Sequence, residues 1–459
     1  MNAPTPLAWR AHFSAVLRLG LPLVGSHLAQ VAIGATDTLM LGWYGVGALA
    51  AGSLAASVFN LLMIVGSGFA FAVMPLVAGA ATRGDDEQLF GVTRMGLWLS
   101  AAYALLVLPL MFWSGSSLFM GQEPAVAAGA QGYLRIACWA MFPALFAMVL
   151  KSYLSALERT RVILAVTLMA ALFNGVANWL LIFGKLGFPE LGLDGAALAS
   201  VIAHCATLGG LLLYSRASPA LSGPGFFSAF WKPDWSRCVQ VFSLGWPIGI
   251  TLLAEAGLFA FSAIMVGLLG ETVLAAHGIA MQLASITFMV HLGLSQVATV
   301  RAGQAISLED PVSLRRGAVV IAACSAGFSA LAIGAFVFAP ELLIGLFLSA
   351  DDARAPTIVP IAITLLTAAA LFQLADGAQV IALGLLRGLQ DTRVPMILAA
   401  IIYWCIGAPA GYLLGFNAGL GGPGVWFGLV VGLGLAAVTL SMRFVRLVPR
   451  VTICADDSS

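Results

Sequence analysis

The chain has 459 residues, of which 61% are apolar and only 9% are charged, and its formal net charge is +1. A soluble domain usually carries about a quarter charged residues because its surface must face water, so this composition excludes a soluble globular fold. It predicts an all-α membrane protein whose solvent is the lipid bilayer. The small net charge gives no support for a nucleic-acid partner.

Twelve apolar stretches are long enough to form membrane helices, because about 20 apolar residues cross a hydrocarbon core of roughly 30 Å. No signal-peptide cleavage site follows the first stretch, so we expect it to remain as an uncleaved span. In chain order, the predicted spans are 14–42, 46–76, 92–114, 126–150, 161–184, 194–215, 238–269, 273–303, 316–348, 357–386, 394–416 and 424–446.

The distribution of basic residues predicts the orientation of these spans, since Lys and Arg favour cytoplasmic loops. With both termini inside, 18 of the 21 Lys and Arg residues fall on the cytoplasmic side, and only Arg135, Lys185 and Arg354 fall outside. Lys151 and Arg387 are among the residues assigned to cytoplasmic span ends, so no basic residue is expected at mid-membrane depth. We therefore expect a multi-pass protein of a bacterial inner membrane.

The two halves of the chain repeat each other. "LGLP" at Leu19–Pro22 recurs as "LGWP" at Leu244–Pro247, an offset of 225 residues. Further matches pair "LERTRV" (Leu157–Val162) with "LQDTRV" (Leu389–Val394), and Gly192 and Gly195 with Gly421 and Gly424. Each copy holds six spans, an even number, so both copies enter the membrane from the same side and are related by a pseudo-twofold axis along the membrane normal.

This repeat predicts two six-helix bundles with a substrate cleft between them. The predicted parts are an N-lobe at 1–215, a cytoplasmic linker at 216–237, a C-lobe at 238–450 and a C-terminal tail at 451–459.

Three of the 20 acidic residues lie inside predicted spans, namely Asp37, Glu255 and Asp376. A charge at membrane depth costs roughly 2.5–3.5 kcal/mol on insertion scales, so such residues face a bundle interior or an aqueous cavity and are functional candidates. A carboxylate in that setting can hold H⁺ or Na⁺ and release it when water arrives. We predict that these three acids couple transport to a cation, with Na⁺ at Glu255 and Asp376 as one alternative.

The acid of the first span has polar neighbours at helical spacing. Gln30 lies two turns before Asp37 and on the same helix face. In the fifth span, Asn174 and Asn178 form an i, i+4 amide pair that could hydrogen-bond Asp37.

The acids of the second half have similar neighbours. Under the repeat, Glu255 corresponds to Gln30 and Ser262 corresponds to Asp37. Phe259 lies one turn from Glu255, and Gln373 and Gln379 flank Asp376 at three residues on either side. The alternative for the amides is interhelical hydrogen bonding without a transport role.

Together with the repeat, the segments "ATDTLMLGWYG", "FNGVANWLLIFG" and "LLRGLQDTRVP" resemble the multidrug and toxic compound extrusion (MATE) family over nearly the whole chain. Asp37 in "ATDTLM", Glu255 in "AEAGLF" and Asp376 in "FQLADGAQV" resemble its NorM-like branch, which carries acids in both lobes. The resemblance implies antiport, in which amphipathic cationic compounds leave in exchange for Na⁺ or H⁺. Phe372 stands where some NorM-like proteins carry Tyr, which leaves the choice of cation open.

Other functions are alternatives to antiport. A flippase of a lipid-linked substrate would be expected to line its cleft with basic residues, and export of a single endogenous metabolite fits the same architecture. An enzyme is not expected, because no nucleophile–base pair or metal-ligand cluster is visible. The six scattered cysteines form no C-x-x-C pair. We therefore expect no cofactor besides the transported Na⁺ or H⁺. We also expect the substrate to be a small drug-like molecule and the protein to function as a monomer.

Overall fold

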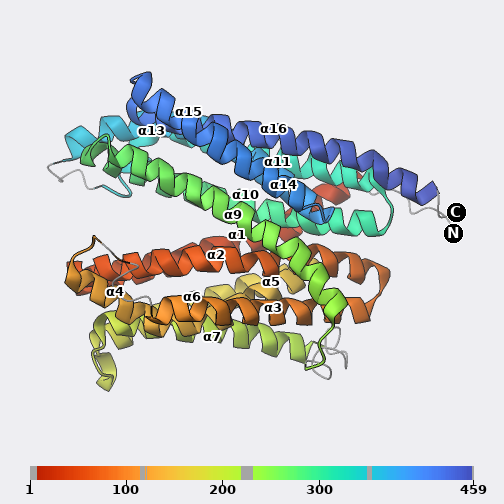
Figure 1. The fold of residues 1–459 in the computed structure, drawn as a ribbon, viewed down its shortest axis with the longest axis horizontal. Helices are drawn as coiled ribbons and strands as arrows, with labels where there is room; N and C mark the ends of the chain where they lie inside the picture. Colours follow the sequence, from red (N-terminus) through yellow and green to blue (C-terminus); the bar gives the residue numbers. More distant parts are fainter. Residues whose placement is uncertain (1–7, 114–118, 120, 219–230, 349–353, 457–459) are drawn as a thin grey trace. The chain divides into compact units, whose positions relative to one another are not determined.

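The computed structural model describes residues 8–113, 119, 121–218, 231–348 and 354–456. Twelve of its helical segments are long and apolar enough to cross a membrane, so the predicted twelve spans are confirmed (Figure 1). The described residues contain no β-strand. The chain is therefore a multi-pass, all-α membrane protein.

The first six spans begin with α1 (Trp9–Tyr44), which carries Pro22 in its interior. The others are α2 (Val46–Arg83), α3 (Asp86–Trp113), α4 (Pro124–Ala137) continuing through η2 (Cys138–Ala140) into α5 (Met141–Ala156), α6 (Thr160–Phe183) and α7 (Gly192–Ala217). A short 3₁₀ turn, η3 (Lys185–Gly187), links α6 to α7.

The last six spans begin with α9 (Trp235–Gly267), which carries Pro247. The others are α10 (Glu271–Ser307), α11 (Pro311–Phe338), α13 (Ala355–Gly388), a composite span of α14 (Arg393–Ile401), η4 (Ile402–Gly407), α15 (Ala408–Tyr412) and η5 (Leu413–Asn417), and α16 (Gly421–Asp456). The turns η4 and η5 are π-helical.

Several predicted span limits are wrong, because a helix can continue beyond the hydrocarbon core of the membrane. α2 continues seven residues beyond the predicted end at 76 and stops at Gly84, whose left-handed backbone (φ 69°) closes the C-terminus. The span predicted at 316–348 is two helices, since α11 ends at Phe338 and Pro340 begins the short α12 (Pro340–Ile344). Proline at that position cannot continue the preceding helix.

The internal repeat reappears in the backbone conformation of the turns. Glu158 and Gln390, which are 232 residues apart, both adopt a left-handed conformation, with φ of 60° and 59°. Gly192 and Gly421 do the same, with φ of 54° and 60°. A non-glycine residue with positive φ is uncommon, so its recurrence at the repeat offset shows that the two halves fold by the same local rules.

The chain forms two compact units, each described here by itself. One unit is Gly25–Gly249, and the other combines Met1–Val24 with Ile250–Ser459. The two points of division, after Val24 and after Gly249, are 225 residues apart and therefore equivalent in the repeat. The lobe limits predicted from the sequence stay a prediction, and residues 219–230 of the predicted linker and 457–459 of the tail lie outside the described residues.

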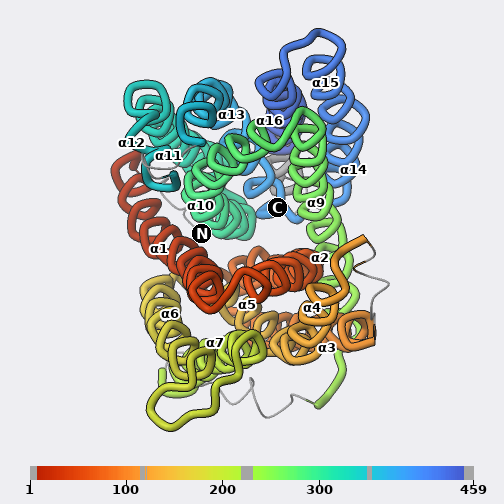
Figure 2. Tube along the Cα trace, turned by 90° about the vertical axis from the view of Figure 1, so that its left-hand side faces the viewer, coloured from red at the N-terminus to blue at the C-terminus, as the bar shows by residue number. Residues whose placement is uncertain are grey.

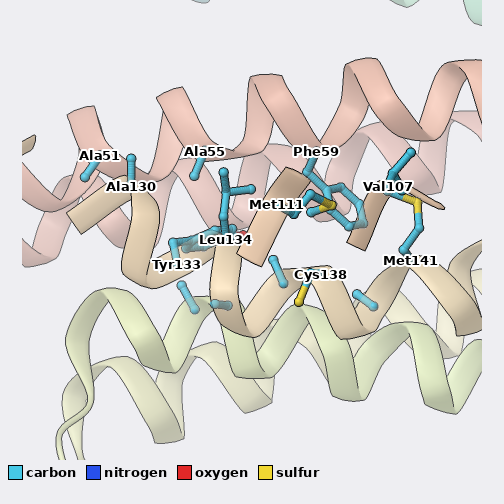
Figure 3. Packing of buried hydrophobic residues seen from close by; sticks show 14 of the residues in the cluster. Ala51, Ala55, Phe59, Val107, Met111, Ala130, Tyr133, Leu134, Cys138 and Met141 are labelled. Carbon is cyan, nitrogen blue, oxygen red and sulfur yellow. The ribbon is translucent and has the colours of Figure 1, made fainter. Parts of the chain in front are cut away.

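In the unit Gly25–Gly249, α2 is the central helix and packs against α3, α4 and α5. Figure 3 shows Ala51, Ala55 and Phe59 projecting from α2 toward Leu134 and the other apolar side chains of this core. The first half of α9 also belongs here, because the ring of Phe242 stacks on Phe69 with centroids 5.9 Å apart. The small side chains of α2 let the neighbouring helices approach closely.

The start of α9 is held by charged groups outside the spans. The backbone N–H of Arg237 donates to Oδ1 of Asp234 at 3.1 Å, which is a helix N-cap. This hydrogen bond, with the guanidinium of Arg237 beside it, lowers the pKa of Asp234. Arg237 also pairs with Glu87 at 2.9 Å, so the beginnings of α3 and α9 are joined.

In the other unit, α13 is central and packs against α10, α11 and α16 (Figure 2). The first residues of α1 pack on the same helices, because a side chain at Gly293 of α10 would meet the backbone of Val24 at 3.0 Å. The guanidinium of Arg316 lies 5.8 Å from the ring centroid of Trp9. By the repeat, α2 corresponds to α10, and α4 and α5 correspond to α13, so the packing of α2 on α4 and α5 recurs as the packing of α10 on α13.

A glycine contact between α6 and α7 gives a test of this packing. A Cβ at Gly195 would lie 2.5 Å from the backbone oxygen of Leu181, whereas nothing lies within 4 Å of a Cβ at Gly209 on the same helix. We expect Gly195→Val to destabilise the protein by about 1–3 kcal/mol or more, the usual effect of overpacking. Gly209→Val should leave the melting temperature nearly unchanged. Thermal unfolding monitored by size-exclusion chromatography compares the two, and equal behaviour would contradict the contact.

Candidate functional site

In the unit Gly25–Gly249, Asp37 of α1 lies in a polar cluster with residues of α6 and α7. Nδ2 of Asn178 donates to Oδ1 of Asp37 at 2.5 Å and also lies 3.2 Å from Oδ1 of Asn174. The hydroxyl of Ser200 donates to Oδ2 of Asp37 at 3.2 Å. The predicted contact between Asp37 and the amide pair is therefore present, and Ser200 is an additional member.

This cluster keeps unused hydrogen-bonding capacity. Both asparagines are completely buried, yet Nδ2 of Asn174 and Oδ1 of Asn178 have no hydrogen-bond partner among the described residues. Such orphan atoms are rare in buried sites and need an explanation. The oxygens of Asp37, Asn174, Asn178 and Ser200 are hard ligands of the kind that Na⁺ accepts, and Asp37 can equally take a proton.

The second acidic site lies in the other unit, where Glu255 of α9 and Asp376 of α13 are buried, with 5% and 0% of their surface exposed. They lie near enough for their charges to interact. Within the part of the chain that the structure describes, Oε1 of Glu255 and both carboxylate oxygens of Asp376 have no hydrogen-bond partner. An ionised carboxylate left in this condition is strongly disfavoured, so protonation or a bound cation would lower the cost of burying these two acids.

Gln379 and Tyr403 extend this acidic site. Nε2 of Gln379 donates to the Tyr403 hydroxyl at 2.6 Å, and Oε1 of Gln379 has no partner in the described segments. Tyr403 is fully buried and lies in the π-helical turn η4, and π-helical turns are frequent at functional sites. The repeat could have indicated Tyr403, because it lies 229 residues after Asn174, the offset that also relates Gly192 to Gly421.

Arg387 corrects the prediction that no basic residue approaches the acids. It lies in the last turn of α13 as expected, but its side chain is buried, with 8% exposed, and its charge interacts with that of Glu255. Neither Glu255 nor Asp376 forms an ion pair with Lys or Arg in the part of the chain that the structure describes. Arg387 therefore influences the site from a distance without neutralising it.

Three other predicted site residues make local or interhelical contacts. The hydroxyl of Ser262 donates to the carbonyl oxygen of Phe259 in its own helix at 2.7 Å. Nε2 of Gln373 donates to the Thr287 hydroxyl of α10 at 2.6 Å, which is the helix–helix role weighed as an alternative for this amide. The ring of Phe259 lies 5.9 Å from that of Phe372, in an edge-on arrangement.

The sequence predicts that Lys151 lies at the cytoplasmic end of a span, whereas the structure places it inside a helix. α5 continues to Ala156, and Nζ of Lys151 lies 3.5 Å from Oε1 of Gln30. Gln30 is near the middle of α1, so the lysine amino group reaches mid-helix depth. The predicted span limit at residue 150 does not reveal the depth of this amino group, because long basic side chains extend several ångströms along the helix axis.

Tyr403 provides a test of the second site. Tyr403→Phe removes the hydroxyl that accepts the hydrogen bond from Nε2 of the buried Gln379, and an unsatisfied buried donor costs about 1–3 kcal/mol. We expect a lower melting temperature and slower transport. Tyr412→Phe is the matched control on the same span, since Tyr412 is 50% exposed. Equal melting temperatures for the two variants would contradict the role of the hydroxyl.

Twelve apolar spans with two separate acidic clusters define the class of the chain as a polytopic α-helical membrane transporter. The MatE family model matches residues 22–180 and 247–413. The chain is 46% identical to the probable multidrug resistance protein NorM of Rhizobium meliloti (strain 1021), over 97% of this chain and 96% of that protein. It is 43% identical to the protein of the same name from Agrobacterium fabrum (strain C58 / ATCC 33970), over 96% of each.

The chain therefore belongs to the MatE family, which confirms the resemblance seen in its sequence motifs. Solved structures share the fold at low sequence identity. A multidrug resistance MATE family transporter in an outward-facing conformation gives a TM-score of 0.86 at 19% identity, covering 96% of each chain. A MOP superfamily transporter from Pyrococcus furiosus gives 0.85 at 19% identity, also covering 96% of each chain.

Among the described residues, no three His, Cys, Asp or Glu side chains gather where they could hold a metal ion. A carboxylate pair with amide and hydroxyl oxygens is still a suitable site for a proton or Na⁺. Binding of either cation by Glu255, Asp376 or Asp37 stays a prediction.

Proposed function

We propose that this protein exports amphipathic, often cationic, drug-like molecules or metabolites in exchange for H⁺ or Na⁺. The observation that carries the proposal is the set of buried acceptor oxygens on Glu255, Asp376 and Gln379 for which the described ranges of the chain supply no donor. A cation supplies what these oxygens lack. The names of the relatives, probable multidrug resistance proteins, support export of drug-like compounds.

In the proposed cycle, the outward-open protein takes up a cation at Glu255 and Asp376, at Asp37, or at both sites. Neutralising the carboxylates weakens the attraction for a cationic substrate, which leaves on the outside. The protein then turns inward, the cation dissociates, and the ionised carboxylates attract a new substrate. Exchange requires competition between cation and substrate, because only a ligand with different affinities for the two states can shift their equilibrium.

Reconstituted proteoliposomes with ethidium as the substrate test this function. A pH gradient and a Na⁺ gradient are imposed separately, with empty liposomes as the control. We expect one gradient, or both, to drive ethidium against its concentration gradient. Equal ethidium movement with and without gradients would contradict cation coupling while leaving the fold assignment intact.

The same preparation tests the two alternatives. A flippase would move a fluorescent lipid between leaflets of the liposome, and an exporter of one metabolite would reject a panel of unrelated cations. We expect the wild-type protein to transport several cations of different shape. We also propose that it works as a monomer in the bacterial inner membrane with both termini in the cytoplasm.

A further inference from the structure

The helices α11, α13 and α16 pack together in the unit that holds Ile250–Ser459 (Figure 2), and a groove of about 400 Å³ runs between them. Leu374 and Ala378 line this groove from α13. Each is two residues from Asp376, which corresponds to more than half a turn of the helix, so the groove and the acidic site lie on opposite faces of α13. The groove is therefore a second, separate site in this unit.

The groove has a buried floor and exposed walls. Ile381 and Phe444 form part of the floor, with 3% and 7% of their surface exposed. Val319 of α11 and Val445 of α16 line the two sides, with 55% and 65% exposed. Because these helices are membrane spans, the exposed walls face hydrocarbon, and a molecule dissolved in the bilayer can enter from the side.

The inner part of the groove offers no free hydrogen-bonding group from its serines. The hydroxyl of Ser325 lies 2.9 Å from Nδ1 of His291, which belongs to α10 behind the groove. The hydroxyl of Ser329 donates to the carbonyl oxygen of Gln373 at 3.3 Å. A polar molecule placed here would lose its hydrogen bonds to water without replacement, so the surface suits a hydrocarbon chain.

The length of the groove matches one leaflet of a bilayer. Along α11 it extends from Ala318 to Ser329, which corresponds to about 16 Å at the helical rise per residue. The hydrocarbon core is roughly 30 Å thick, so the groove covers about half of it. Ala318, Ala322 and Ala326 follow one another at four-residue spacing along one side, and their small side chains leave the space that the groove occupies.

Positive charge lies at one end of the groove, where α11 begins and where α13 and α16 end. Arg315 precedes Val319 by four residues, so it continues the groove-lining face of α11 by one turn. Arg446 directly follows Val445. Both arginines are exposed, and neither forms an ion pair with a described Asp or Glu side chain. Under the orientation predicted from the sequence, this end faces the cytoplasm.

We propose that the groove binds one anionic phospholipid, with an acyl chain between α11, α13 and α16 and the phosphate at Arg315. A basic group at the mouth of a groove between membrane helices recognises anionic headgroups, and the apolar interior accepts the chain. The bound lipid contacts the face of α13 opposite Asp376. This inference goes beyond the proposed export function, and its test needs no transport.

Native mass spectrometry of the purified protein in detergent measures lipid binding directly. The probes are dioleoylphosphatidylglycerol and dioleoylphosphatidylcholine, which have the same acyl chains, whereas only the former carries a net negative charge. Ala322→Phe fills the groove, and Ala323→Phe is its control, because both alanines are exposed and, of this pair, Ala322 is the one that lines the groove. Arg315→Gln removes the charge, and Arg393→Gln is its control, an exposed arginine at the start of α14.

We expect the wild-type protein to bind phosphatidylglycerol about fivefold or more tightly than phosphatidylcholine, the usual gain from one basic residue near an anionic headgroup. Arg315→Gln should bring the two affinities to within about twofold of each other. Ala322→Phe should weaken binding of both lipids about tenfold or more, since the chain loses its apolar contacts. Both control variants should bind as wild type does.

Equal affinities of the wild-type protein for the two lipids would overturn the proposal, as would unchanged binding in Ala322→Phe. Displacement of phosphatidylglycerol by ethidium would assign the groove to a drug-like molecule and would overturn it as well. Size-exclusion chromatography shows that each variant is folded. If Ala322→Phe does not fold, Arg315→Gln, which changes only an exposed side chain, decides the outcome, and equal selectivity in this variant and the wild type contradicts the proposal.

Discussion

Asp376→Asn should reduce ethidium efflux in proteoliposomes to the level of empty liposomes. Asn has nearly the same shape as Asp but cannot bind and release a proton, and it attracts Na⁺ more weakly because it carries no charge. Asp376 is completely buried and both of its oxygens lack a donor, so no hydrogen bond among the described residues depends on its carboxylate. Undiminished efflux by this variant would remove Asp376 from the mechanism.

The stability of the same variant should not fall. An unsatisfied buried polar group costs about 1–3 kcal/mol, so its removal can stabilise a protein. We expect Asp376→Asn to keep the wild-type melting temperature and Asp376→Leu to raise it. Glu341→Gln is the matched control, since Glu341 is an exposed acid of the same unit whose loss should affect neither efflux nor stability. A large drop in melting temperature for Asp376→Asn would show that the carboxylate has a structural partner.

The second large effect concerns Asp37, and we expect Asp37→Asn to stop efflux as well. Here the carboxylate already accepts hydrogen bonds from Asn178 and Ser200, so the loss affects an organised cluster. The Asn side chain keeps one acceptor oxygen, but its amide NH₂ group replaces the other. That group is a donor and would face Asn178 or Ser200, which are themselves donors to Asp37. Asp194→Asn is the control, because Asp194 is exposed in the same unit.

Cation release on substrate binding distinguishes the two acidic sites. If the clusters act separately, ethidium binding to Asp37→Asn should still release cations from Glu255 and Asp376, though fewer than wild type. The double variant with Asp376→Asn should release almost none. A pH indicator in weakly buffered detergent measures protons, and displacement of ²²Na⁺ measures sodium. Complete loss of release in Asp37→Asn alone would show instead that the two clusters act as one.

The architecture and the acids of the site could be predicted from the sequence because both leave periodic signals. Apolar stretches and Lys and Arg positions gave the twelve spans, and a lone acid inside such a stretch, as at Asp376, is conspicuous. Asn178 was also found, since its spacing from Asn174 puts both amides on one helix face. These features can be predicted because they depend on residues near one another in the sequence, or on the rarity of charged residues inside apolar spans.

Other members of the clusters depend on contacts between distant helices. Ser200 is one of many serines in apolar spans, and nothing in its own segment shows that it faces Asp37. Tyr403 is presented by a π-helical turn, which shifts the register in a way that a 3.6-residue period does not capture. The depth of the Lys151 amino group and the burial of Arg387 could not be predicted, because span limits follow the hydropathy of whole residues, whereas these charged groups lie at the ends of long flexible side chains.

The equivalent divisions after Val24 and after Gly249 have a mechanical consequence. Each falls inside a long helix and shortly after a proline, Pro22 in α1 and Pro247 in α9, so each compact unit contains part of a helix that continues into the other. Proline removes one backbone hydrogen bond and makes bending of a helix less costly at that point. Any rotation of one unit against the other must flex these two helices, and stiffening them by Pro→Ala replacement should therefore slow turnover without altering how tightly the substrate is held.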